Sequence, residues 1–401
     1  MQQLSPTEAA LVGAIDPAPM LARVEAWCAI NTGTRNLAGL ATQAALLADA
    51  FAALPGAVHM VEPTAVEAIA PDGSAVAQAH GSHLVLRVRP QASRRLLLTG
   101  HMDTVYAADH PFQALAWTDP ATVNGPGVAD MKGGIAVILA ALAAFEASPA
   151  AAAVGYDVMI NSDEETGSLS SAPLIAHLAE GKAAALTYEP SALPDGTLAG
   201  ARGGSGNFSA IVTGRSAHAG RNPQDGRNAL VAAADIAVRL KHMETAGLKI
   251  NPARIDGGSA NNVVPDHAVL RFNIRPKAED DAERFSRAIW LVCHEIEREH
   301  EVEVHLHGGI TRPPKPLTAQ AEQLFGLVRT CGAALGQRIA WQPSGGVCDG
   351  NNIAALGVPV VDTMGVRGGA IHSSQEYLIV PSLAERAALS ALVLHRLSGG
   401  N

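Results

Sequence analysis

Residues 96–105 read Leu-Leu-Leu-Thr-Gly-His-Met-Asp-Thr-Val, and this stretch decides the fold. An apolar run ends at a histidine and a carboxylate, so His101 and Asp103 leave a predicted buried strand together. Residues i and i+2 of a strand share a face, and the two side chains can therefore act as a unit. A carboxylate can hold one imidazole nitrogen and turn the other toward a metal ion. The pair is a candidate metal-binding unit if matching ligands occur downstream.

Length and composition are those of a globular protein with a large core. The chain has 401 residues, of which 48% are hydrophobic and 17% charged, which predicts two to three domains. The net charge is −9 and there is no run of Lys or Arg, so nucleic acid and anionic membranes are poor candidate partners. No Cys-X-X-Cys motif and no signal-peptide pattern occur, which predicts a reduced, cytoplasmic protein. The most apolar segment, residues 135–145, is too short to span a bilayer and is expected to be a buried helix.

Residues 1–203 alternate helical and strand patterns. Helices are expected at 20–30, 40–54 and 131–145, and strands at 84–88, 95–100, 156–161 and 183–188. This alternation predicts an α/β sheet covered by helices, in which sites gather at the C-terminal ends of strands.

The pattern changes at about residue 204. Strands are expected at 208–213, 248–255, 268–274 and 302–307, with helices at 226–242 and 279–300. This β-α-β-β-α-β order is that of a ferredoxin-like α+β module. The α/β pattern then resumes, with helices at 317–335 and 382–397 and strands at 338–342 and 358–363. We therefore predict one α/β domain in two parts, residues 1–203 and 315–401, interrupted by a module at residues 204–314.

Four further segments place acids or a histidine next to predicted strands or helices. They are Ala129-Asp130-Met131, Ser162-Asp163-Glu164-Glu165, Tyr188-Glu189-Pro190 and Ile371-His372-Ser373. Histidines and carboxylates without cysteine suit Zn²⁺, Co²⁺ or Mn²⁺. The acids outnumber the ligands of one tetrahedral ion, which favours two ions roughly 3.5–4 Å apart that share a carboxylate. In the adjacent pair of glutamates, a cation would neutralise one, and the other could take a proton from water.

With these segments the chain resembles the M20 family of metallopeptidases and amidohydrolases, and within it the glutamate carboxypeptidase branch. The resemblance covers nearly the whole chain. It implies a mixed-sheet α/β catalytic domain that holds two divalent ions, zinc first and cobalt or manganese next. The implied ligands are His101 and Glu189 for one ion, His372 and Glu165 for the other, and Asp130 for both.

The resemblance also implies roles around these ligands. Asp103 would orient His101, and Glu164 would be the general base that activates water and then protonates the leaving amine. The peptide bond between Asp130 and Met131 is expected to be cis, despite a cost of about 3 kcal/mol.

By the same resemblance, the inserted module is a lid that also forms a homodimer. His218 in Gly-Arg-Ser-Ala-His-Ala-Gly and Asn262 in Asn-Asn-Val-Val-Pro would stabilise the oxyanion, the histidine acting in the partner subunit's active site. Arg275 would grip a substrate carboxylate. The loop around Gly346 would face the substrate, and Cys348 stands where a small hydroxyl residue is common.

Taken singly, each of these residues has an ordinary structural explanation. Asp130 could be a helix N-cap, and the pair Glu164-Glu165 could lie in a solvated loop. Gly125-Pro126-Gly127 is not followed by a nucleotide-binding motif. No Gly-X-Ser-X-Gly occurs, so a serine hydrolase lacks its nucleophile elbow.

The sequence therefore predicts a dinuclear-metal hydrolase. Its expected substrate is a small molecule, a C-terminal acidic dipeptide or an N-acyl amino acid, whose amide bond next to a free carboxylate is cleaved by water. Arg202-Gly203-Gly204 lacks the lysine expected for a glutamate side chain. Three alternatives stay open: a deacylase of the acetylornithine or succinyl-diaminopimelate type, a catalytically silent binding protein that keeps this fold, and a nucleotide-dependent oxidoreductase.

Overall fold

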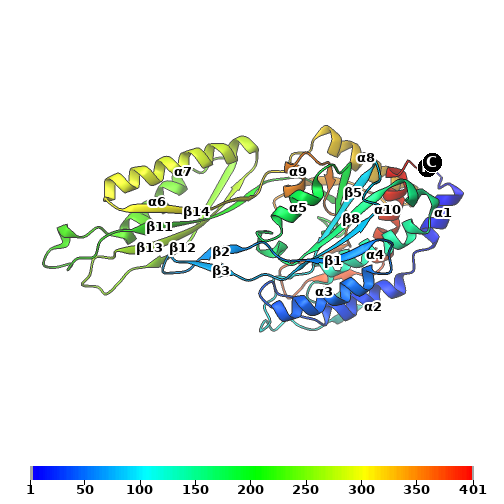
Figure 1. Cartoon of the computed structure of the whole chain (residues 1–401), viewed down its shortest axis with the longest axis horizontal. Helices are drawn as coiled ribbons and strands as arrows, with labels where there is room; N and C mark the ends of the chain where they lie inside the picture. Colours follow the sequence, from blue (N-terminus) through cyan, green and yellow to red (C-terminus); the bar gives the residue numbers. More distant parts are fainter. Residues whose placement is uncertain (1–2, 400–401) are drawn as a thin grey trace.

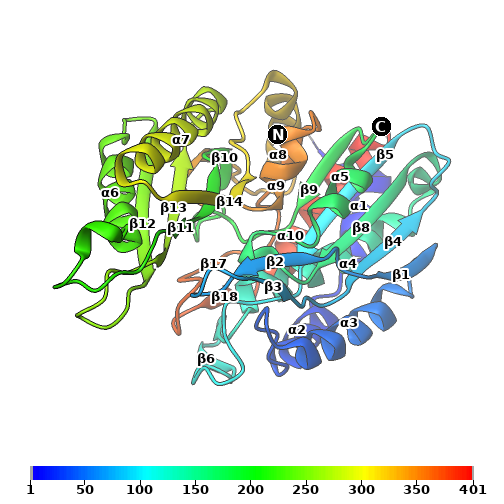
Figure 2. The same cartoon turned by 60° about the vertical axis from the view of Figure 1, so that its left-hand side comes forward.

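The computed structural model describes residues 3–399 and shows an elongated molecule with two parts (Figure 1). One part is an α/β domain that holds both ends of the described chain (Figure 2). The other is a smaller α+β module, residues 205–312, that projects from it.

Six strands form the central sheet of the α/β domain, in the order β1-β4-β8-β5-β9-β16. Their bounds are β1 (Ala57–Val61), β4 (His83–Val88), β8 (Gly155–Asn161), β5 (Arg95–His101), β9 (Ala184–Thr187) and β16 (Val360–Val361). The last four in that order are parallel, whereas β1 and β4 are antiparallel to their neighbours. The expectation of a mixed α/β sheet is confirmed, and the C-terminal ends of β8, β5 and β9 share one edge.

Helices cover both faces of this sheet. The alternation of side chains along β5 explains why: Leu96 and Leu98 pack into one core and Leu97 into another. The first core contains α2 (Pro17–Cys28), α3 (Leu37–Phe51), α4 (Gly133–Glu146), α8 (Ala319–Ala334) and α10 (Ser382–Leu397). The second contains α5 (Ala172–Ala179) and α9 (Asp349–Ala355), and α1 (Pro6–Gly13) packs outside α4 and α10.

Helix α4 follows an irregular turn at Val128–Lys132. The stretch Val128–Glu146 is long and apolar enough to cross a membrane by length and composition, but 89% of its apolar window is buried. It is a core helix of the α/β domain. The expectation of a helix from residue 131 is wrong at its start, because Asp130 and Met131 have non-helical backbone angles.

Several short strands were not predicted. They are β2 (Val66–Ile69) and β3 (Ala75–Gln78), β10 (Leu198–Arg202), and the sheet of β6 (Ala116–Asp119), β7 (Thr122–Asn124), β18 (Tyr377–Ile379) and β17 (Gly368–Gly369). All are two to five residues long, too short for a readable alternation. The strand expected at 338–342 is β15 (Trp341–Ser344), which begins only at Trp341 and pairs with β10 outside the central sheet. Only Val360 and Val361 of the expected strand 358–363 pair as β16.

The module has the predicted ferredoxin-like order. Its elements are β11 (Ser205–Thr213), α6 (Ala229–His242), β12 (Leu248–Gly257), β13 (His267–Pro276), α7 (Glu279–His300) and β14 (Glu303–Arg312). The strands lie in the order β12-β13-β11-β14, every neighbouring pair antiparallel. Phe208 and Phe272 stack in a separate core beneath Phe285 of α7.

Two chain crossings join the module to the α/β domain. Arg202 and Lys315, one on each crossing, exchange two backbone hydrogen bonds of 2.9 Å. The side-chain amide of Asn351 donates to the carbonyl oxygens of Gly203, at 2.9 Å, and Pro313, at 2.8 Å. Both crossings are thereby fastened to α9. That residues 204–314 form an independent domain stays a prediction.

Candidate metal centre and active site

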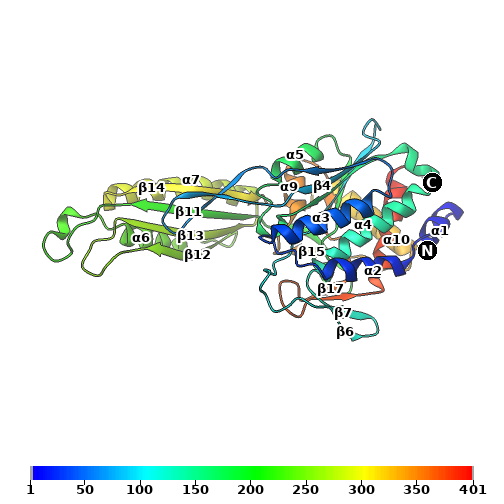
Figure 3. The same cartoon turned by 60° about the horizontal axis from the view of Figure 1, so that its bottom comes forward.

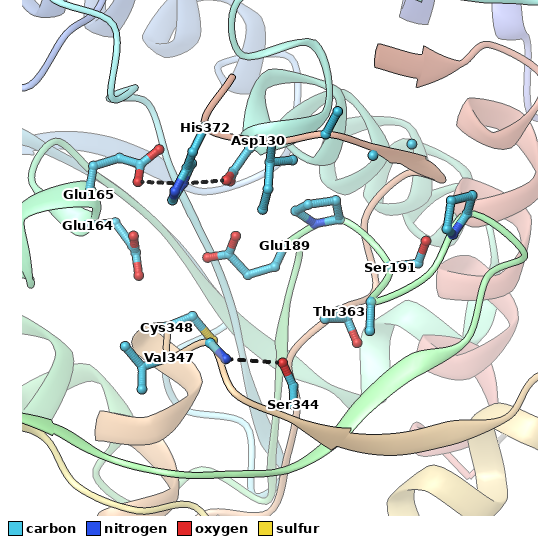
Figure 4. Close-up of a pocket in the computed structure, with 18 of the residues that line it drawn as sticks. Asp130, Glu164, Glu165, Glu189, Ser191, Ser344, Val347, Cys348, Thr363 and His372 are labelled. Atoms are coloured by element: carbon cyan, nitrogen blue, oxygen red, sulfur yellow. Dashed lines mark hydrogen bonds and ion pairs between the residues drawn. The ribbon is translucent and has the colours of Figure 1, made fainter. Parts of the chain in front are cut away.

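The loops at the C-terminal edge of the central sheet bring together all five predicted metal ligands. His101 ends β5, Asp130 lies in the turn before α4, Glu165 follows β8, Glu189 follows β9, and His372 lies between β17 and β18. Figure 4 shows four of them, Asp130, Glu165, Glu189 and His372, facing one pocket. Their side chains come from segments up to 271 residues apart in the chain, from 101 to 372.

The ligand geometry has two halves that share one carboxylate. His101 Nε2 lies 3.1 Å from Asp130 Oδ1 and 3.7 Å from Glu189 Oε2. His372 Nε2 lies 3.2 Å from Asp130 Oδ2 and 3.1 Å from Glu165 Oε2. Each carboxylate oxygen of Asp130 therefore lies next to one histidine, as expected of a carboxylate that bridges two ions.

The donor set fits divalent cations. Potential ligand atoms of His101, Asp130 and Glu165 lie within 4.8 Å of one another, and so do those of His101, Glu164 and Glu189. Within residues 3–399, the buried Oε1 of Glu189 has no hydrogen-bond partner, and a buried polar atom without a partner is costly. Imidazole and carboxylate donors suit Zn²⁺, Co²⁺ or Mn²⁺.

The pKa values of these groups describe a cluster that takes up protons in place of cations. Hydrogen bonds to Asp130 and Glu165 raise the pKa of His372 to about 11. Burial opposes protonation of His101, but Glu189 and the hydrogen bonds to Asp103 and Asp130 hold its pKa well above the usual value. Burial, together with Asp130, raises the pKa of Glu165 to about 7. His372 is therefore protonated at neutral pH in the metal-free protein.

Metal binding is accordingly expected to weaken as pH falls. His372 is protonated throughout the range from pH 8 to 6, so binding displaces its proton at every pH, and below about pH 7 Glu165 contributes another. The apparent affinity should fall about tenfold per pH unit for each proton released. Calorimetric titration with Zn²⁺ in two buffers of different ionisation enthalpy measures the number of protons released on binding. An affinity independent of pH over this range would contradict the proton count.

Asp103 does more than the sequence predicted. His101 Nδ1 lies 3.4 Å from its carboxylate and 3.0 Å from its backbone oxygen. The carboxylate also accepts the hydroxyl of Thr34 at 2.7 Å and the backbone N–H groups of Glu164 and Glu165 at 3.2 Å each. Asp103 therefore fixes the turn that carries both glutamates as well as facing His101.

Glu164 lies beside this cluster but forms no ion pair with His101 or His372. Its Oε1 accepts a hydrogen bond of 2.8 Å from Arg312. Burial raises the pKa of Glu164 well above its ordinary value, and Arg312 opposes that rise. Sequence reasoning missed Arg312, because Thr311-Arg312-Pro313 matches no motif and only the fold brings it to the turn after β8.

Glu376 is a second missed residue. Its Oε1 accepts the backbone N–H groups of Ala129 and Asp130, each at 3.0 Å, and its Oε2 accepts the Tyr106 hydroxyl at 2.9 Å. It thus joins the loop of His372 to the turn of Asp130. Burial raises the pKa of Glu376 to about 7. Its sequence signal is only a glutamate four residues after His372.

The turn of Asp130 has two features relevant to the sequence-based expectations. The peptide bond between Asp130 and Met131 is cis, as expected. The alternative of Asp130 as a helix N-cap is wrong, because α4 begins at Gly133 and Lys132 precedes it. The start of α4 must also pack closely, since a Cβ on Gly134 would lie 2.1 Å from the carbonyl oxygen of Tyr188.

Beside the ligands lies a pocket of about 500 Å³. The predicted Gly346 and Cys348 line it, together with Arg202 and Ser344 (Figure 4 shows Cys348 and Ser344). The Arg202 guanidinium donates to Asp362 Oδ2 at 2.8 Å and to the Gly346 carbonyl at 3.0 Å. The loop of Gly346 is thereby tied to a buried arginine.

Three predicted residues lie outside the pocket of their own chain. His218 is exposed, its Nδ1 accepting the N–H groups of Gly220 and Arg221. Asn262 is its neighbour, because the Asn262 carbonyl accepts the N–H of Ala219 at 2.9 Å. His218 lies in the loop between β11 and α6, and Asn262 in the loop between β12 and β13. These two loops form the end of the module away from the α/β domain (Figure 3). Arg275 is exposed on β13 and donates to Asn273 at 2.9 Å.

Known proteins resemble this chain over most of its length. Carboxypeptidase G2 from Pseudomonas sp. (strain RS-16) is 28% identical over 329 residues, which is 80% of this chain and 78% of that protein. Succinyl-diaminopimelate desuccinylase from Xanthomonas oryzae pv. oryzae is 29% identical over 327 residues, 75% of this chain and 83% of that protein.

A solved structure shares the fold. It is a dinuclear metal-binding peptidase of the M20 family from Bacillus subtilis, with a TM-score of 0.66 and 13% identity, covering 96% of this chain and 99% of that one. The family model described as Peptidase family M20/M25/M40 matches residues 97–396, about three quarters of the chain. The predicted family resemblance is thus confirmed: the chain belongs to peptidase family M20/M25/M40 and is a metal-dependent hydrolase of that family.

Proposed function

We propose that this hydrolase cleaves an amide bond next to a free carboxylate, as a carboxypeptidase or an N-acyl amino acid amidohydrolase. The observation that carries the proposal is the sharing of Asp130 by two histidine–carboxylate sets beside Glu164. The relative named carboxypeptidase G2 supports the first activity, and the relative named desuccinylase supports a deacylase as the second candidate.

The proposed centre holds two divalent ions. Zinc is the first expectation for their identity, and cobalt or manganese the next. His101 and Glu189 would hold one, His372 and Glu165 the other, and Asp130 both. When bound, such ions polarise a carbonyl group and make water more acidic. The Bacillus subtilis peptidase described as dinuclear and metal-binding supports the number of ions.

Glu164 is the proposed general base. It takes the proton of the attacking water and delivers it to the leaving amine, so the amide C–N bond breaks without a covalent intermediate. Its burial supports this role, because a buried carboxylate gains a proton more readily than an exposed one. Asp103 keeps His101 and the Glu164 turn in place during the exchange.

The charge beneath the pocket favours anionic substrates. Arg202 and Lys315 are both buried, and both contact the single carboxylate of Asp362, at 2.8 and 3.3 Å. Two cations against one anion leave an excess positive charge close to Gly346. This excess positive charge supports recognition of a substrate carboxylate. Arg275 would contribute a further contact to that carboxylate when the module closes.

We propose that the protein forms a homodimer through the module. Leu230, Val231 and Val238 of α6 and Ile255 of the edge strand β12 are large apolar side chains between 36% and 54% exposed. An exposed apolar patch of this kind marks an association surface. In a dimer, His218 and Asn262 would complete the oxyanion site of the partner subunit.

We expect the protein to act in the cytoplasm. The four cysteines, Cys28, Cys293, Cys331 and Cys348, are all buried and unpaired, which supports a reducing compartment.

A hydrolysis screen tests the proposed function. The metal-loaded protein, with Zn²⁺, Co²⁺ or Mn²⁺, is offered C-terminal acidic dipeptides, glutamyl conjugates, and N-acetyl and N-succinyl amino acids, with amine release as the readout. Turnover of a free carboxylate substrate but not of its methyl ester is expected. Faster cleavage of N-acetyl or N-succinyl amino acids would favour the deacylase. Two bound ions without turnover of any substrate would favour the silent binding protein.

A further inference from the structure

Arg312 stands where the module returns to the α/β domain, and its side chain reaches the proposed base. It is the last residue of β14 and only 2% exposed. Its Nη2 donates to Glu164 Oε1 at 2.8 Å and to the Glu164 carbonyl at 3.2 Å. One guanidinium nitrogen therefore holds both the side chain and the main chain of Glu164.

The remainder of the guanidinium is fixed by residues of the α/β domain. Its Nη1 donates to Asp349 Oδ1 at 2.5 Å and to Asn352 Oδ1 at 2.9 Å, both on α9. Asp349 also accepts the hydroxyl of Ser168 at 2.5 Å and the amide of Asn161 at 2.6 Å. A planar fork held at several points has little freedom to turn, so Arg312 is a rigid support.

This support engages one oxygen of the Glu164 carboxylate. Within residues 3–399, Oε1 is the only one of the two carboxylate oxygens of Glu164 that takes part in a hydrogen bond or ion pair. An oxygen of Glu164 lies within 4.8 Å of ligand atoms of His101 and Glu189. The carboxylate is thus anchored on one side and adjoins the ligand cluster.

Neutralising a buried arginine does not explain the contact with Glu164. Asp349 already supplies one full negative charge to Arg312 at 2.5 Å. Burying a second carboxylate against the same cation adds a desolvation cost. When a carboxylate is held in one orientation despite the desolvation cost of burying it, that orientation is typically needed by the site.

We propose that Arg312 is a positioning residue for Glu164: it fixes the carboxylate of the base in the orientation that lets it accept the proton of the attacking water. The proposal rests on the proposed function, in which Glu164 is the base. It also ties that base to the module, because Arg312 pairs with Ser205 across β14 and β11 at the two crossings. The base is therefore held by the strand through which the module is attached.

The test compares Arg312→Ala and Arg312→Lys with the unaltered protein, using the best substrate of the hydrolysis screen. Arg312→Ala is expected to lower kcat by about 10²-fold, as for a reacting group displaced by about 1 Å, with KM within about threefold and two ions still bound. Guanidinium ion in the buffer should restore part of kcat. Arg312→Lys keeps the positive charge but loses the planar guanidinium group, so its kcat should lie between those of the unaltered protein and Arg312→Ala.

The matched control is Arg386→Ala. Arg386 is an equally buried arginine, 1% exposed, whose guanidinium donates to the Gly196 carbonyl at 2.8 Å, and it does not line the pocket. Its replacement should lower thermal stability but leave kcat per folded, metal-loaded molecule unchanged.

Unchanged kcat in Arg312→Ala, or a loss that equals that of Arg386→Ala and does not respond to guanidinium, would overturn the proposal. If Arg312→Ala does not fold, Arg312→Lys decides: a normal kcat with two bound ions overturns it, and a lowered kcat with unchanged KM supports it. An unaltered protein that binds two ions and hydrolyses nothing refutes the proposed function itself, which is a separate outcome.

Discussion

Replacing Glu164 by alanine is expected to lower turnover by about 10²–10⁴-fold, the usual contribution of a general base, while both metal ions stay bound. The geometry separates the two neighbouring glutamates: Glu165 lies 3.1 Å from His372, whereas Glu164 pairs with Arg312. Steady-state kcat and the metal content of the same preparation, measured by atomic emission, check both halves of this expectation.

Two control variants make the result specific. Glu165→Ala should lose metal as well as activity, because it removes a proposed ligand. Glu146→Ala removes a glutamate that pairs with Arg89 and does not line the pocket, and it should change neither. If Glu164→Ala loses metal and Glu165→Ala retains it, the roles of the two residues are exchanged.

His218→Ala is expected to lower kcat by about 10²–10³-fold, as for the loss of one oxyanion donor. In a single chain this histidine is exposed in the loop between β11 and α6, and it lies outside the pocket. So large an effect from so distant a residue requires either a partner subunit or closure of the module. A matched control is His294→Ala, since His294 is an exposed histidine of α7 that pairs with Glu297.

Mixing the two inactive variants distinguishes these explanations. If His218 acts on the partner subunit, a heterodimer of Glu164→Ala and His218→Ala has one intact site and one doubly defective site. Random exchange between equal amounts should then restore roughly a quarter of the normal activity, given a two-fold symmetric dimer. No recovery, once subunit exchange has been demonstrated by mass spectrometry, would mean that His218 acts within its own chain or not at all.

The sequence predicted best those elements whose signal is local and repeated. The helices Glu279–His300 and Ser382–Leu397 have the predicted bounds, because their apolar residues recur with helical spacing. The strand that ends at His101 was found within one residue, since its apolar run stops at a polar motif. His101 ends this strand, and Glu165 and Glu189 follow two other strands of the same sheet, so strand prediction also predicted that these three ligands meet at one edge.

The contacts that orient these ligands could not be predicted in this way. Arg312 bonds to Glu164 across 148 positions, and Glu376 bonds to the N–H of Asp130 across 246. Each is one charged residue in a loop or at a strand end, with no periodicity to mark it, and its partner is set by packing of the whole domain. The short strands were missed for a related reason, because two to five residues show too little alternation to read.

The bonds from Glu376 to the Asp130 turn have a consequence for the way the centre assembles. They join the loop of His372 to the loop of Asp130 by contacts that need no cation. The conformational entropy of these distant loops is therefore lost when the chain folds, before any ion binds. The ions then bind ligands that are already in position. Loss of the ions should leave the fold and the shape of the pocket intact, so the protein can exchange one metal for another without unfolding.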